Sequence, residues 1–212
     1  MSGQPEDGAL RLPMFPLGTV LFPHMPLPLH VFEERYKALT RDCLRSDRRF
    51  GVVLIERGPE VGGGDVRFGM GTVARIVAEA ALTGGRWALL ARGEERIRIS
   101  NWLPDDPYPV ALVERLADPG GPAGSQLRIL ERAVRRSLAL AAELGLPDTP
   151  ASTFELDEST ETALWQLCAL APVGPADKQR LLEESEPGRR CDLLLRLAEE
   201  AADLFAYRLS GR

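Results

Sequence analysis

The chain has 212 residues, of which 44% are hydrophobic and 27% are charged, values typical of an ordinary globular protein. Its 26 basic and 31 acidic residues leave a net charge of −5, which disfavours general nucleic-acid binding because that affinity depends on clustered cations. No apolar run reaches the ~20 residues of a membrane span, and the polar, acidic start is no signal peptide, so we expect a cytoplasmic protein.

The first segment after the leader is dominated by proline. Residues 1–9 are polar and acidic, and we expect them to be disordered. Prolines then recur from Pro13 to Pro28, and because proline fixes φ and lacks an amide donor, they exclude a helix. We therefore predict short extended pieces, joined by tight bends, at 10–15, 19–22 and 27–31.

A helix is predicted over residues 33–44. Glu33 and Glu34 fall in its first turn, where acidic side chains interact favourably with the helix dipole. The residues that recur at helical spacing and would form its buried face are Phe32, Tyr36, Leu39 and Cys43.

Short strands without long intervening helices follow. Their apolar patterns place them at 50–55, 71–78, 87–92, 95–102 and 109–116. Within 95–102, Ile97 and Ile99 alternate with Arg96 and Arg98, which predicts one buried and one solvated face. A glycine-rich loop at 58–65, which contains Val61, is expected to be mobile. Residues 10–118 should therefore form a mixed, mostly antiparallel barrel with one helix.

A segment rich in glycine and proline, 118–124, separates the β-rich part from a helical part. Apolar stripes and flanking Gly or Pro predict helices at 126–144, 161–170, 174–184 and 187–211. The predicted fold class is thus α+β: a leader at 1–9, a β-rich subdomain at 10–118 and a helical bundle at 119–212.

Several short motifs follow one another in a recognisable order. They are Leu12-Pro13, Phe15-Pro16-Leu17, Leu21-Phe22-Pro23, Pro28-Leu29-His30-Val31-Phe32-Glu33, Arg35-Tyr36, Arg49-Phe50-Gly51, Gly71-Thr72-Val73, Arg96-Ile97-Arg98-Ile99, Pro107-Tyr108-Pro109 and Lys178-Gln179. In this order the chain, over residues 10–205, resembles the N-terminal substrate-binding domain of the Lon protease family. The resemblance implies a PUA-like pseudo-barrel and the recognition of unfolded or degron-bearing polypeptides.

The residues for the rest of Lon chemistry are missing from this sequence. ATP hydrolysis needs a glycine-rich phosphate loop that ends in lysine, but the two lysines, Lys37 and Lys178, follow no such loop. A nucleophile elbow of the GxSxG type is also missing. We therefore expect no catalytic residue, no cofactor and no enzymatic activity.

Metal ligands are too few for a site. His30 and Glu33 make two candidate ligands, whereas zinc usually has at least three from the protein. Cys43, Cys168 and Cys191 lack any CxxC spacing, which predicts buried reduced thiols. We expect no metal.

The resemblance therefore implies a non-catalytic polypeptide-binding module that acts as an adaptor, a chaperone-like holder or a regulator of proteolysis. A groove between barrel and helices, or an open sheet edge, would hold the peptide. The candidate polypeptide-binding residues, which are apolar, are Met25, Pro26, Leu27, Phe32, Tyr36 and Val61. The residues expected to maintain the structure of the motif are Pro16, Pro23, Pro28, Glu33 and Arg35.

The expected partners are unfolded or degron-bearing polypeptides, together with an ATP-dependent protease or chaperone. We expect no membrane partner, and nucleic acid is disfavoured. Two alternatives remain open. An RNA-binding module would use a basic face with an aromatic residue, built from Arg86, Trp87, Arg92, Arg96 and Arg98. A hydrolase would place a group with a strongly shifted pKa in a cleft.

Overall fold

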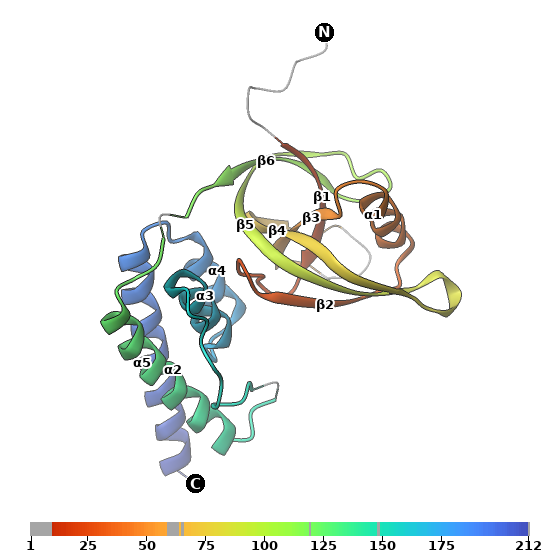
Figure 1. Ribbon diagram of the computed structural model, residues 1–212. Helices are drawn as coiled ribbons and strands as arrows, with labels where there is room; N and C mark the ends of the chain where they lie inside the picture. Colours follow the sequence, from red (N-terminus) through yellow and green to blue (C-terminus); the bar gives the residue numbers. More distant parts are fainter. Residues whose placement is uncertain (1–9, 59–63, 65, 119, 148, 212) are drawn as a thin grey trace. The chain divides into compact units, whose positions relative to one another are not determined.

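The computed structural model of the chain describes residues 10–58, 64, 66–118, 120–147 and 149–211 (Figure 1). The chain divides into two compact units, Met1–Asp118 and Pro119–Arg212. The glycine-rich loop expected at 58–65, with Val61, lies outside the described residues except for Gly58 and Gly64. None of the described helices combines the length and the apolar character that crossing a membrane requires.

The described residues of the first unit form a mixed sheet of six strands and one α-helix. The strands are β1 (Leu10–Leu17), β2 (Pro26–Val31), β3 (Arg49–Arg57), β4 (Val66–Ala81), β5 (Trp87–Leu103) and β6 (Val110–Leu116), with helix α1 (Glu34–Arg45) between β2 and β3. Their order is β2-β5-β4-β3-β1-β6, and an additional β5–β6 pairing closes five of the strands into a ring. β1 and β3 run parallel, whereas the other described pairs are antiparallel. The mixed, mostly antiparallel sheet predicted from the sequence is thus confirmed.

Strand β5 pairs with two different strands along the same edge. Its first half, residues 87–92, pairs with β2, and its second half, residues 96–103, pairs with β6. The sequence predicted two strands here, but they form one continuous strand, and another segment of the chain passes close to it at Gly93. A Cβ atom on Gly93 would lie 2.3 Å from the carbonyl oxygen of Phe22.

The extended piece predicted at residues 19–22 does not pair as a strand of the sheet. This segment is irregular, although Leu21 and Phe22 are buried. Its anchor is a side-chain hydrogen bond, because the buried Thr72 hydroxyl donates to the carbonyl oxygen of Leu21 at 2.6 Å. Apolar content indicated burial correctly here, but burial did not require a strand ladder.

Two hydrophobic clusters fill the first unit. One packs α1 against the sheet through Tyr36, Leu39 and Cys43, as the helical spacing predicted. The other joins Leu12, Met14, Val53, Val73, Ile97, Ala111 and Val113 from five strands. Phe32 departs from the prediction: it precedes α1 and is 55% exposed, so it is not part of the buried helix face.

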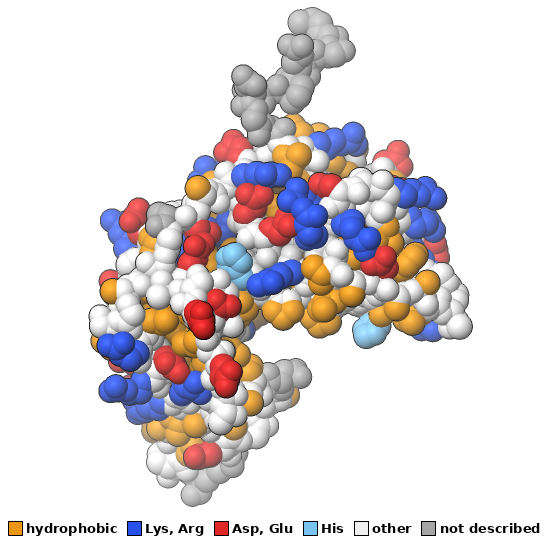
Figure 2. Space-filling view, in the orientation of Figure 1, with side chains coloured by type: hydrophobic (Ala, Val, Ile, Leu, Met, Phe, Trp, Pro, Cys, Tyr) orange, Lys and Arg blue, Asp and Glu red, His pale blue; other side chains and the backbone are white. Residues whose placement is uncertain are grey.

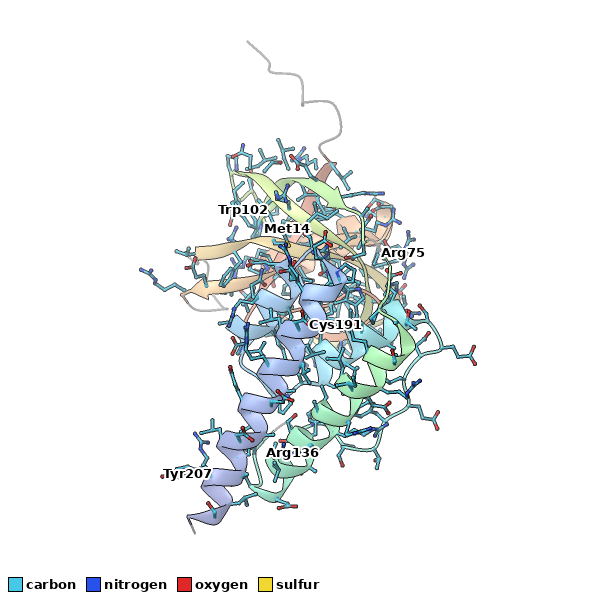
Figure 3. All side chains as sticks on the ribbon, turned by 90° about the vertical axis from the view of Figure 1, so that its left-hand side faces the viewer. Met14, Arg75, Trp102, Arg136, Cys191 and Tyr207 are labelled. Atoms are coloured by element: carbon cyan, nitrogen blue, oxygen red, sulfur yellow. The ribbon has the colours of Figure 1, made fainter. Side chains whose placement is uncertain are left out.

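The described residues of the second unit form four helices: α2 (Gly124–Glu143), α3 (Thr160–Leu170), α4 (Pro175–Glu183) and α5 (Pro187–Ser210). Proline occupies the first turn of α4 and α5, where its missing amide hydrogen costs no helical bond. α2 and α5 lie alongside each other (Figure 1), and Figure 3 shows Cys191 near one end of α5 and Tyr207 near the other. The buried side chains Leu130, Val134 and Leu138 of α2 and Leu194, Ala198 and Ala202 of α5 give this unit its own core.

Candidate functional site

An arm of three strands extends from the ring: β2, residues 87–92 of β5 and residues 76–81 of β4. In Figure 1 its hairpin end, coloured yellow, projects away from the ring. The strands are joined in register, so that Pro28, Leu90 and Ala78 form one row across the arm. We call the side of the arm that faces away from the core its outer face.

The turn before β2 sets the position of this strand. His24 adopts a left-handed φ of 65°, and its amide donates to the carbonyl oxygen of Gly93 at 2.8 Å. The guanidinium Nε of Arg92 donates back to the carbonyl oxygen of His24 at 3.1 Å. The amide of Gly93 in turn donates to the carbonyl oxygen of Met25 at 2.9 Å. These bonds fix the start of β2 against the middle of β5.

The outer face of the arm leaves large apolar side chains in solvent. Alternation along the strands buries Leu27, Val31, Leu89, Ala91 and Ile76 in the core. Their neighbours Pro26, Pro28 and Ala78 are exposed, Leu90 is 40% exposed, and Val77, at a register shift in β4, is 52% exposed. Figure 2 shows hydrophobic side chains gathered along the lower margin of the β-rich unit, where Figure 1 places β2. Exposed large apolar side chains gathered in this way typically mark a binding site.

A second feature, the seam pocket, lies at the edge of β2 that faces away from β5. The β6 ladder of β1 ends at Pro13, so the last residues of β1 have a strand neighbour on the β3 side only, within the described part of the chain. A pocket of about 200 Å³ opens beside this end of β1. Its lining comes from β1, β2 and the start of α1: Phe15, Leu17, Pro28, Leu29, His30, Val31, Phe32, Glu33 and Tyr36.

Aromatic stacking gives the seam pocket a rigid wall. The rings of Phe15 and Tyr36 stack with their centroids 4.0 Å apart, and the Arg35 guanidinium lies 4.4 Å from the centroid of the Tyr36 ring. Arg35 Nε also donates to Glu33 Oε2 at 3.1 Å. The pair neutralises charge beside the pocket, so an apolar group can enter without facing an isolated carboxylate.

Most of the described acidic side chains of the first unit form ion pairs with arginine. Glu94 accepts from Arg49 Nε at 2.6 Å and from Arg75 Nε at 2.5 Å. Burial alone would raise the pKa of Glu94, but these two hydrogen bonds and the charges of the arginines lower it below the usual value. Two further carboxylates, those of Glu95 and Asp105, pair with Arg115 and Arg67. In the described part of the chain, no three His, Cys, Asp or Glu side chains come together as metal ligands would.

The basic face suggested by the sequence is not assembled. Arg96, expected on a solvated face, is 1% exposed and pairs with Asp118 at 2.8 Å, so this expectation is corrected. The counter-charge of Asp118 explains how an arginine can be buried there. Arg98 lies 3.7 Å from Glu114, and Trp87 is half-buried against the core cluster. The arrangement therefore gives no support to the RNA-binding alternative.

The residues proposed from the sequence fall in different places. Pro26 lies on the outer face of the arm, whereas Phe32 and Tyr36 line the seam pocket. Met25 is half-buried and Leu27 is buried in the core. Sequence reasoning missed Leu90, Val77, Phe15 and Leu17; the adjacent pair Leu89-Leu90 was a signal, because a strand must turn one of two consecutive side chains outward.

Comparisons with known proteins agree on one family. The family model of the ATP-dependent protease La (LON) substrate-binding domain matches residues 11–200. The chain is 31% identical over 206 residues to Lon protease 2 of Myxococcus xanthus and 27% identical over 202 residues to the Lon protease of Escherichia coli strain K12. These alignments cover 94% and 92% of this chain but 25% of each relative, so the chain spans about a quarter of their length.

Solved structures give the same picture. The crystal structure of a Lon N-terminal domain protein from Xanthomonas campestris superposes with a TM-score of 0.65 at 30% identity, covering 88% of this chain and 98% of that one. The N-terminal domain of a Mycobacterium avium complex Lon protease gives 0.57 at 18% identity, covering 90% and 99%. The second match shows similarity of fold alone.

Proposed function

This chain belongs to the ATP-dependent protease La (LON) substrate-binding domain family, and from that premise we propose that it binds polypeptides through the outer face of the arm and the seam pocket. Its partners would be unfolded or degron-bearing polypeptides, and its role that of a non-catalytic adaptor, holder or regulator of proteolysis. An ATP-dependent protease or chaperone would receive the bound polypeptide.

The observation that carries this proposal is the exposure of Leu90 and Val77 on an arm whose opposite face buries Leu27, Leu89 and Ile76 in the core. Unfolded polypeptides differ from folded ones mainly in the apolar side chains that they expose. A fixed apolar surface therefore selects for them without reading a particular sequence. The seam pocket adds a place for one larger apolar side chain, because its floor is Phe15, Leu17 and Tyr36 and its mouth carries Phe32.

A titration with a permanently unfolded probe tests this proposal. A reduced and carboxymethylated protein, labelled with a fluorophore, is titrated with the wild-type chain and with Leu90→Gln. We expect Leu90→Gln to weaken binding about tenfold, since one large aliphatic contact contributes about 1.5 kcal/mol.

Ile129→Gln is the matched control, because Ile129 is 54% exposed but lies on α2 in the other unit. It should leave the affinity unchanged. The proposal fails if the wild-type chain does not bind the unfolded probe, or if the control weakens binding as much as Leu90→Gln does. If the chain instead binds a labelled RNA at low salt and this binding is lost at high salt, the result would favour the RNA-binding alternative.

A further inference from the structure

The two outer edges of the arm differ in their capacity to accept another strand. The amide of Gly93 donates to the carbonyl oxygen of Met25, so the odd-numbered residues of β2 direct their backbone groups toward β5. The backbone groups of Pro26 and Pro28 therefore point away from β5, toward the open edge of β2, and neither residue has an amide hydrogen to donate there. The β2 edge is blunted in the manner that protects natural sheets from further pairing.

The β4 edge loses its neighbour halfway along. The pairing of β3 with β4 ends at the Arg49–Arg75 position. Beyond it, Arg48 forms hydrogen bonds with both backbone groups of Ile76. The Ile76 amide donates to the Arg48 carbonyl oxygen at 2.9 Å, and Arg48 Nε donates to the Ile76 carbonyl oxygen at 3.2 Å. β4 continues to Ala81 with β5 on one side, and among the described residues no strand lies on the other.

The ladder shows which groups point away from β5. The Leu82 amide donates to the Arg86 carbonyl oxygen at 2.8 Å, so even-numbered residues at this end of β4 bond to β5. Glu79 and Ala81, which alternate with them, must direct their amides and carbonyls outward. The backbone amides and carbonyls of Glu79 and Ala81 thus offer two hydrogen-bond donors and two acceptors. Their spacing matches that of the backbone groups of an added extended strand.

Apart from Glu79, the side chains at this edge are small or apolar. Ala78, Ala80 and Ala81 are exposed, and the edge carries no proline. The carboxylate of Glu79 is paired with Arg48, so its charge is already neutralised. Val77 and Leu82, which are exposed at the two ends of the edge, would contact apolar side chains of an added strand.

We propose that the β4 edge at residues 79–81 binds the backbone of the client, which adds to the arm as a short extra strand. This inference rests on the proposed function and names the class of segment recognised: an extended, proline-free stretch with free backbone amides and alternating apolar side chains. A second copy of the chain is the poorer occupant, because two residues of free backbone are few for a stable dimer, which buries about 1,200–2,000 Å².

The decisive probe is a labelled peptide of alternating valine and lysine in three forms: unmodified, N-methylated at every even amide, and N-methylated at every odd amide. N-methylation removes donors on one side of an extended chain only. We expect one methylated form to bind within twofold of the unmodified peptide and the other to bind at least tenfold more weakly. Equal binding of both forms overturns the proposal, because side-chain recognition alone does not distinguish them.

A variant of the protein provides an independent test. Ala81→Pro removes an outward donor without removing a ladder bond, as Pro28 does in β2. We expect Ala81→Pro to lower the affinity for the unmodified peptide at least fivefold. The thermal unfolding temperature of the variant should stay close to that of the wild type. If the variant does not fold, the methylated peptides on the wild-type chain still decide the question.

The outcomes separate this inference from the proposed function. If Leu90→Gln weakens binding while Ala81→Pro and both methylated peptides bind normally, the edge proposal is wrong and polypeptide binding stands. If the wild-type chain binds neither the unfolded probe nor any peptide, both are wrong. A concentration-dependent dimer in sedimentation that Ala81→Pro abolishes would assign the edge to a second copy and overturn client pairing.

Discussion

Single residues in this chain are placed by charge as much as by hydrophobicity. Arg49 and Arg75 lie directly opposite each other on β3 and β4, a position at which two like charges repel. Glu94 of β5 accepts a hydrogen bond from each, which turns the repulsion into a three-residue network. Arg75 is labelled in Figure 3. The same logic places Arg96 in the interior, beside Asp118.

Replacing Glu94 by Gln should lower the free energy of unfolding at pH 7 by about 1 kcal/mol. The pKa of Glu94 is lowered in the folded state, so its contribution is complete above the ordinary value of 4.5 and is lost as the pH falls through the folded-state pKa. Urea denaturation at pH 7 and at pH 3.5 measures the difference between wild type and variant, which should shrink at the lower pH.

The control for this experiment is Glu114→Gln. Glu114 is exposed and lies 3.7 Å from Arg98, so its loss should change stability little at either pH. A Glu94→Gln effect that stays the same or grows at low pH would show that the ionised carboxylate is not the stabilising species.

Buried thiols follow the sequence prediction at the same scale. Cys43, Cys168 and Cys191 are free and buried. Burial raises the pKa of the Cys43 and Cys168 thiols to about 12 and that of Cys191 to about 11. These side chains therefore behave as small apolar groups in the packing.

At the scale of elements, glycine decides how closely strands approach. A Cβ atom on Gly71 would lie 2.1 Å from the Val52 carbonyl oxygen, which is backbone and cannot move aside easily. Gly69, two residues earlier on the same strand, has nothing within 4 Å of that position. The surroundings of the two glycines thus differ, although nothing in the sequence around them distinguishes one from the other.

We predict that Gly71→Ala lowers the free energy of unfolding by about 1–3 kcal/mol, because the strand must shift to admit the methyl group. Gly69→Ala, the matched control, should be neutral or slightly stabilising, since it reduces the freedom of the unfolded chain. Urea denaturation of both variants gives the comparison. Equal stability of the two would mean that the Gly71 contact relaxes freely.

Helices were the elements most readable from the sequence. The predicted helices at 126–144, 161–170 and 174–184 agree with α2, α3 and α4 to within a few residues, because Gly and Pro punctuate them. Strands were less readable. Residues 87–103 form one strand, and residues 19–22 form none, because each outcome depends on a neighbour that comes from another part of the chain.

At the scale of the whole chain, each unit has a core of its own. α2 and α5 supply apolar side chains to the second unit, and its single tryptophan, Trp165, is buried under the guanidinium of Arg190 at 3.8 Å. The first unit encloses two clusters within its sheet and α1. Such units usually fold alone.

We therefore expect fragments 1–118 and 119–212 to fold separately. The first should end after Asp118, which keeps the ion pair with Arg96. Circular dichroism should show a helical spectrum with a cooperative thermal transition for fragment 119–212, and a β-rich spectrum for fragment 1–118. An unfolded spectrum for either fragment at 20 °C would show that its core depends on the other.

The sequence by itself determined the family, the α+β class, the helical spans and the burial of Tyr36, Leu39 and Cys43, because these depend on local periodicity and on motifs in order. It also directed attention to Pro26 and Phe32. Only the tertiary structure decided which apolar residues stay exposed: Leu90 and Leu89 are alike as residues, and pairing with β2 and β4 turns one outward and one inward. The free edge of β4 was likewise decided by where β3 ends, which no local pattern in β4 encodes.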